Sequence, residues 1–188
     1  NAKVNSAMIA DHVREGLTAR GDYAGRKEGD AINAVSNAAK TVEAVYSSPF
    51  LSHTPMEPMN CTARWTSDKA EVWVPTQNAE ASLAKLAETA GLPLEKCDVY
   101  VTDLGGAFGR KGGQQDFVSQ AVNIAKQFPG TPIKMIWSRE EDQMHDYYRP
   151  ISQCHMKAGL DEKGNLVGMT LRSSGQSINA WVNPSAIK

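Results

Sequence analysis

Residues 104–113 read LGGAFGRKGG; they follow the apolar run VYV at residues 99–101 and precede a helical pattern that begins near Gln114. Glycine has no Cβ, so the glycines of this stretch allow a sharp turn that brings the backbone close to a ligand. Successive amide N–H groups in such a turn can enclose an anion, helped by the positive end of the helix that follows. Arg110 and Lys111 bring positive charge to the same place. The sequence therefore predicts a strand, an anion-binding loop for phosphate, pyrophosphate or an oxo-anion, and a helix.

Two familiar glycine-rich motifs do not fit this loop. A dinucleotide fingerprint needs the spacing Gly-x-Gly-x-x-Gly, whereas the loop reads Gly-Gly-Ala-Phe-Gly. A P-loop needs Ser or Thr after Gly-Lys, whereas Gly112 follows Lys111 here. A plain glycine-rich turn without a ligand stays open as an alternative. Phe108 favours the binding interpretation, because a large apolar ring is unusual in a solvated turn and suits a lid over a flat ligand.

Apolar periodicity along the chain predicts an α+β fold, with a two-layer mixed sheet and packed helices. Helices are predicted at residues 6–17, 79–90 and 114–128, and a short one after Ser138. Strands are predicted at residues 42–46, 62–65, 70–74, 97–102, 133–137, 154–160 and 166–171. A chain of 188 residues suits one domain, into which residues 1–30 lead as a helix and a linker.

Two helices carry more specific predictions. Asn78 is expected to cap the N-terminus of the helix at residues 79–90. The helix at residues 114–128 is expected to face the core with five apolar side chains: Phe117, Ala121, Ile124, Ala125 and Phe128.

Composition and charge limit the partners of this chain. It carries a net charge of −1, with 41% hydrophobic and 22% charged residues, as in ordinary globular proteins. This balance offers no bulk attraction to nucleic acid or to anionic lipid. No apolar run reaches the roughly 18–20 residues that span a bilayer, and no signal peptide is visible. We therefore expect no nucleic-acid partner and no membrane insertion.

The cysteines and histidines show no metal-binding pattern. Cys61, Cys97 and Cys154 form neither a Cys-x-x-Cys pair nor a zinc or iron–sulfur spacing. The four histidines are not spaced as metal ligands either. We therefore predict no metal site in these residues, and expect that any iron–sulfur cluster belongs to another chain.

Three further segments turn the loop into part of a larger pattern. Residues 49–63 read PFLSHTPMEPMNCTA, residues 73–78 read WVPTQN and residues 136–150 read IWSREEDQMHDYYRP. In this order, the four motifs resemble the xanthine oxidase family of molybdenum hydroxylases. The resemblance is strongest to the large (β) subunits of isoquinoline 1-oxidoreductase and aldehyde dehydrogenase type, and it covers about residues 29–180.

The resemblance implies a bound molybdopterin with molybdenum, in its cytosine dinucleotide form. Such enzymes oxidise an aldehyde or an N-heteroaromatic carbon with oxygen from water, and pass electrons to 2Fe–2S clusters, here on a small partner subunit. Motif matching places the cofactor-binding residues at Gly105, Gly106, Ala107, Phe108, Gly109, Arg110 and Gln77. Family large subunits are several times longer, so the chain looks like an excised domain that works with the remaining domains of its subunit. The resemblance favours the periplasm over the cytoplasm.

The chain also departs from the family pattern. The catalytic glutamate of the family lies near the far C-terminal end of the large subunit, so we expect no catalytic residue here and no activity from this segment alone. Leu51 stands where other members have a glutamine. Glu57 is a candidate general base, and its alternative role is to fix the turn at residues 55–58 by bonding backbone amides. His53 could face a substrate channel or be a satisfied structural histidine, and His145 could help to bind a substrate or form an inter-domain contact surface. The competing functional class is a noncatalytic α/β module that binds a phosphate-bearing ligand or a partner subunit through the same loop.

Overall fold

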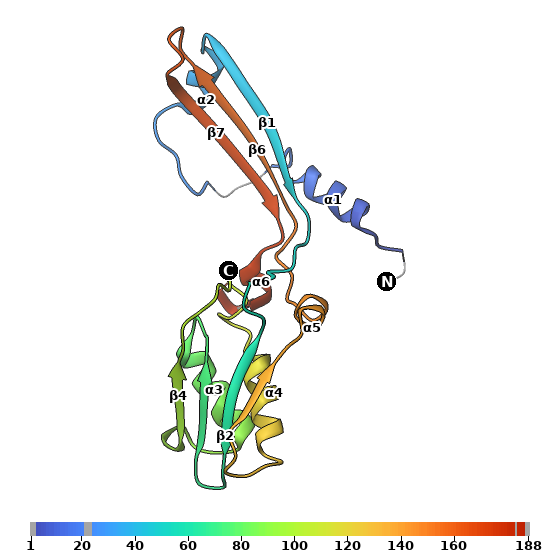
Figure 1. The fold of residues 1–188 in the computed structure, drawn as a ribbon. Coiled ribbons are helices and arrows are strands. Elements are labelled where there is room, and N and C mark those ends of the chain that lie inside the picture. The colour runs from blue at the N-terminus through green and yellow to red at the C-terminus, as the bar shows by residue number, and fades with distance from the viewer. Residues whose placement is uncertain (1–2, 21–23, 183, 187–188) are drawn as a thin grey trace. The chain divides into compact units, whose positions relative to one another are not determined.

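The computed structural model describes residues 3–20, 24–182 and 184–186 (Figure 1). It confirms the predicted α+β class, but the strands form two sheets, not one. The chain divides into two compact units: unit 1 draws on residues 1–51 and 149–188, and unit 2 is residues 52–148. The sequence analysis had treated residues 1–188 as a single domain. Each unit has a sheet of its own, and only the sheet of unit 2 is mixed.

Unit 1 is built on an antiparallel sheet in the order β1-β6-β7. Its elements are α1 (Ser6–Glu15), α2 (Ala31–Ser36), β1 (Lys40–Ser48), β6 (Ser152–Leu160), β7 (Leu166–Gly175), α6 (Ile178–Val182) and the 3-10 turn η2 (Pro184–Ala186). The sequence analysis did not predict α2, a helix of six residues. Asp30 caps it, because its side chain accepts a hydrogen bond from the amide of Asn33 at 3.2 Å. The predicted linker within residues 1–30 includes residues 1–2 and 21–23, which lie outside the described part.

Unit 2 is a four-stranded sheet covered on one face by two helices (Figure 1). Its elements are β2 (Asn60–Trp65), β3 (Ala70–Val74), α3 (Ala79–Ala90), the 3-10 turn η1 (Leu94–Lys96), β4 (Cys97–Val101), α4 (Asp116–Ala125), β5 (Ile133–Ile136) and α5 (Arg139–Met144). The strand order is β4-β3-β2-β5, and β3 and β4 run parallel. The predicted spans for β3 and α3 are confirmed residue for residue.

The orientation predicted for α4 is partly wrong. Ile124 was expected in the core but is 42% exposed, and Val118 and Val122 are fully or almost fully buried in its place. Phe128, 54% exposed, lies beyond the end of the helix at Ala125, which is shorter than the predicted span. Just before the helix, the buried side chain of Gln115 bonds to Ser82 and to backbone carbonyls of the preceding loop. These bonds tie the start of the helix to α3 and to that loop.

Candidate functional site

Four loops meet at one edge of the sheet in unit 2. The parallel strands β3 and β4 end side by side, with Val74 paired to Val101. Strand β2 begins at the same edge, because it runs antiparallel to β3, and its first residue Asn60 pairs with Ile136 at the end of β5. The four motifs that the sequence analysis singled out therefore converge. Ligand sites commonly form outside the carboxyl ends of parallel strands, where such loops gather.

The glycine loop, residues 104–113, presents unused backbone donors. Gly106 and Gly109 have φ angles of +84° and +109°, in the region that favours glycine. Arg110 and Gly112 donate to carbonyls inside the loop. Among the described residues, the amides of Gly106, Ala107 and Phe108 have no hydrogen-bond partner. Three consecutive free N–H groups in a tight turn make a site for an oxygen-rich anion.

Phe108 lies on the surface of this loop. Its side chain is 69% exposed, although its backbone has a positive φ of +55°, which is uncommon for a residue with a Cβ. Ala107 beside it is 2% exposed and anchors the turn. The ring lies over Gly106, where a Cβ would be 3.5 Å from two ring carbons. The ring is therefore open to solvent, and its role as a lid stays a prediction.

Glu57 ties the loop to the segment before β2. Its Oε2 accepts from the amide of Gly105 at 3.0 Å and from Nζ of the fully buried Lys111 at 2.7 Å, and its Oε1 accepts from Asn60. Burial works against ionisation, but these hydrogen bonds outweigh it and lower the pKa of the Glu57 carboxyl. Glu57 therefore serves as an anchor, as its structural interpretation had it. It anchors the glycine loop, however, and not its own turn.

Gln77 holds the other end of the same loop. Its side-chain Oε1 accepts from the amide of Gly109 at 3.1 Å, and its backbone N–H donates to the carbonyl of Lys111 at 3.0 Å. Nε2 of Gln77 has no partner within the described part of the chain, and the residue is exposed. It therefore presents a donor group beside the free amides of the loop.

The positive charges expected on the loop are not available to a ligand. The Arg110 guanidinium is fully buried; it forms a two-pronged pair with Asp116 at 2.8 and 3.0 Å and lies 2.9 Å from Asp146. The ammonium group of Lys111 is likewise paired, with the Glu57 carboxylate. The prediction that Arg110 and Lys111 offer free positive charge to a ligand is therefore wrong. Neither Asp116 nor Asp146 was singled out in the sequence, since no local spacing links either of them to Arg110.

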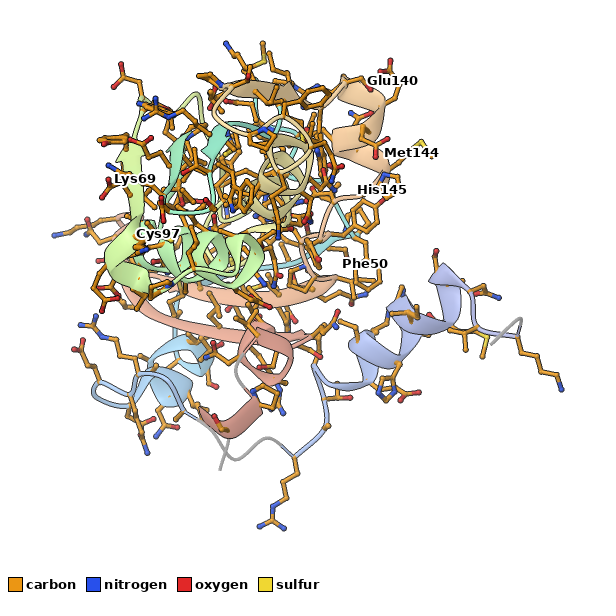
Figure 2. All side chains as sticks on the ribbon, turned by 90° about the horizontal axis from the view of Figure 1, so that it is seen from below. Phe50, Lys69, Cys97, Glu140, Met144 and His145 are labelled. Atoms are coloured by element: carbon orange, nitrogen blue, oxygen red, sulfur yellow. The ribbon has the colours of Figure 1, made fainter. Side chains whose placement is uncertain are left out.

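Two histidine candidates have different surroundings. His53 is nearly buried, with Nδ1 3.1 Å from both carboxylate oxygens of Asp146, which also accepts from Ser52. Burial works against ionisation of Asp146, but hydrogen bonds from His53 and Ser52 outweigh it and lower the pKa of this carboxyl. His145 is exposed (Figure 2); it pairs with Glu141 at 3.1 Å, and its ring meets the Trp137 ring edge-on at a centroid distance of 6.5 Å. Trp137 in turn lies against the Arg110 guanidinium, 5.7 Å from its ring centroid.

The described residues contain no group of three or more His, Cys, Asp or Glu side chains arranged to hold a metal ion. The three cysteines are free thiols, and burial raises the pKa of Cys61 to about 12. None of the helices described here has the length and apolar character to cross a membrane. The chemistry that the residues support is anion binding by backbone donors.

Comparison with known families identifies the domain to which this loop belongs. A family model of the molybdopterin cofactor-binding domain matches residues 15–177. The chain belongs to this family. The donor set fits such a cofactor, because free amides, Gln77 and an exposed ring can receive oxygen atoms and a flat heterocycle. The resemblance stated from the four motifs is confirmed.

Several members of the family are similar over most of this chain. The molybdenum-binding subunit PaoC of the aldehyde oxidoreductase of Escherichia coli O157:H7 is 28% identical over 89% of the chain and 23% of its own length. The large subunit of nicotine 6-hydroxylase from Paenarthrobacter nicotinovorans is 32% identical over 75% of the chain and 17% of its own length. The chain thus spans less than a quarter of these relatives.

Solved structures of the family share the fold. Quinoline 2-oxidoreductase from Pseudomonas putida 86 superposes with a TM-score of 0.57 at 22% identity, over 75% of this chain and 18% of that one. The aldehyde oxidoreductase of Desulfovibrio gigas gives a TM-score of 0.54 at 19% identity, over 78% of this chain and 16% of that one. At this level of identity the similarity establishes the architecture.

Proposed function

We propose that this chain is the part of a molybdenum hydroxylase large subunit that holds the molybdopterin cofactor at the glycine loop. The single observation that carries the proposal is the run of three free amides at Gly106, Ala107 and Phe108, held in place by Glu57 and Gln77. When bound, the cofactor supplies the two-electron redox chemistry. The chain supplies binding and orientation.

Each loop residue has a defined task in this proposal. The free amides donate to oxygen atoms of the bound group, and Gln77 adds a side-chain donor from the next loop. Phe108 covers a flat ring and excludes water from the polar contacts beneath it, which strengthens them. The pair of Glu57 and Lys111 keeps the amides at fixed positions, so that little reorganisation accompanies binding. The buried side chain of Arg110 stabilises the loop through its ion pairs with Asp116 and Asp146.

The activity of the whole subunit is part of the same proposal. It oxidises an aldehyde or an N-heteroaromatic carbon with oxygen taken from water, and electrons leave to 2Fe–2S clusters on a small partner subunit. The names of the relatives support both substrate classes. The catalytic glutamate lies outside these 188 residues, so this segment alone is inactive. The cofactor is the cytosine dinucleotide form, and the periplasm is the proposed compartment.

A substitution at Gly106 tests the proposal in the full-length subunit. Gly106→Val places a β-branched side chain at φ +84° and blocks close approach to the free amides. We expect molybdenum and pterin content, measured by metal analysis and by fluorescence of the oxidised pterin, to fall at least about tenfold, as expected when two or three hydrogen bonds of about 1 kcal/mol are lost.

Gly130→Val is the matched control. Gly130 has a nearly identical φ of +82°, and a Cβ there would meet no heavy atom within 4 Å. The two variants carry the same backbone strain, but only one lies in the proposed site. Equal cofactor content in both variants would remove the loop from its role. A wild-type subunit without molybdenum and pterin would favour the noncatalytic module instead.

A further inference from the structure

Two segments of unit 2 run alongside each other at the proposed site. The backbone amide of Glu57 donates a hydrogen bond to the carbonyl of Gly105, and the amide of Gly105 donates one to the carboxylate of Glu57. Next, a Cβ on Gly106 would lie 3.8 Å from Cβ of Pro55. Last, a Cβ on Gly109 would lie 3.7 Å from Nε2 of His53. The segment at residues 53–57 therefore lines the glycine loop from Gly105 to Gly109.

Both segments hold an unusual backbone conformation. Thr54 has a φ of +39° and Phe108 a φ of +55°, and no other non-glycine residue in the described part of the chain has a positive φ. Such conformations cost energy, and they persist where surrounding contacts force them, which is commonly at binding sites. Thr54 also precedes Pro55, which restricts its backbone further. Thr54 directly follows His53, whose Nε2 lies beside Gly109.

The imidazole of His53 is held at one nitrogen and open at the other. Nδ1 faces the Asp146 carboxylate at 3.1 Å, and the backbone amide of His53 donates to the same carboxylate. Since an ionised carboxylate only accepts, Nδ1 carries a proton. Nε2 has no partner among the described residues. The side chain is 11% exposed, and Nε2 is not among the fully buried atoms that lack a partner, so it is open to a ligand from outside.

We propose that His53 is a further cofactor-contacting residue, whose Nε2 forms a hydrogen bond with a polar atom of the group held by the glycine loop, on the side of Gly109. Asp146 is its positioning residue, because it fixes the tautomer and the ring orientation. This inference rests on the proposed function. It adds a side chain from the segment at residues 53–57 to a site otherwise made of backbone donors and Gln77.

Two amide substitutions separate binding from structural support. In His53→Asn, the side-chain nitrogen falls near the position of Nδ1, so the bond to Asp146 is kept and the outer contact is lost. In His53→Gln, the terminal amide group falls near Nε2 and can accept through Oε1 or donate through its nitrogen, so the outer contact is kept. In the full-length subunit, we expect His53→Asn to release molybdenum and pterin about tenfold faster during dialysis, and His53→Gln to stay within about threefold of wild type.

Thermal unfolding of the cofactor-free proteins provides the second readout. His53→Asn should unfold within about two degrees of wild type, since it keeps the hydrogen bond to Asp146. Cofactor retention equal to wild type in His53→Asn would overturn the inference. So would loss of cofactor in both variants together with loss of thermal stability, which would make His53 purely structural. A wild-type subunit without cofactor would overturn the proposed function itself.

Discussion

Glu57 carries the main electrostatic link between the glycine loop and the segment before β2. Lys111 is fully buried, and Glu57 is 28% exposed at the side chain, so the pair is partly removed from water. A buried cation is costly without its partner, and hydrogen bonds to charged groups contribute more than neutral ones. The pair therefore combines stability with the exact placement that the free amides of the loop need.

Replacing Glu57 by Gln should destabilise unit 2 by about 2 kcal/mol at neutral pH, since Lys111 loses its counter-charge. The folded state lowers the pKa of Glu57 below its ordinary 4.5, so this stabilisation is complete above that pH and is lost as the pH falls through the folded-state pKa. The difference in free energy of unfolding between wild type and variant, from urea titrations, should therefore shrink below about pH 4.5. A difference that is independent of pH would contradict the role of this ion pair.

Helix α3 shows how one side chain sets the boundary of an element. Asn78 accepts from the amide of Ala81 at 3.0 Å through its side chain, which confirms the predicted cap. At the other end, Gly91 adopts a φ of +72° and closes the helix. The helix is thus delimited at both ends by residues whose local chemistry is visible in the sequence.

Asn78→Ala should lower the free energy of unfolding by about 1 kcal/mol, because one helix N–H loses its acceptor. Asn123→Ala is the matched control: Asn123 is exposed within α4, where alanine is the better helix former. Urea unfolding followed by circular dichroism measures both. The cap would carry no energy if the two variants were equally stable.

At the scale of the whole molecule, unit 2 is inserted between two neighbouring strands of unit 1. Strands β1 and β6 pair without interruption from Lys40↔Leu160 to Ser48↔Ser152, yet all of unit 2 separates them in sequence. Strand β6 also packs under α2, because Gly159 leaves room for it. A Cβ on Gly159 would lie 2.7 Å from Cβ of Ala38 and 3.0 Å from Cα of Val35.

Gly159→Val should therefore push α2 away and destabilise unit 1 by about 1–3 kcal/mol, as overpacking does. Ala158→Val is the control, because successive residues of a strand face opposite sides of the sheet. Hydrogen exchange of peptides from β6 and β7 reports the effect. Equal exchange rates in the two variants would show that the close approach of α2 contributes little to stability.

The sequence by itself determined most of the elements, the class of fold and the family. Strands β3 and β4, helix α3 and the glycine loop are encoded by local alternation, helical periodicity and glycine, within a dozen residues each. The motifs for the family are short and ordered, so they could be found without coordinates. Backbone conformation and capping depend on near neighbours, which is why these predictions held.

Only the tertiary structure decided how those parts combine. The division into two sheets depends on β1 meeting β6, and local periodicity says nothing about pairing between distant strands. Likewise, Arg110 pairs with Asp116 of α4 and lies 2.9 Å from Asp146 of another loop, so a charge that looks free in the sequence is buried in the fold. Burial and ion pairing depend on residues brought together from far along the chain. The sequence identified a loop with the donors of an anion site, and the fold decided which donors remain free.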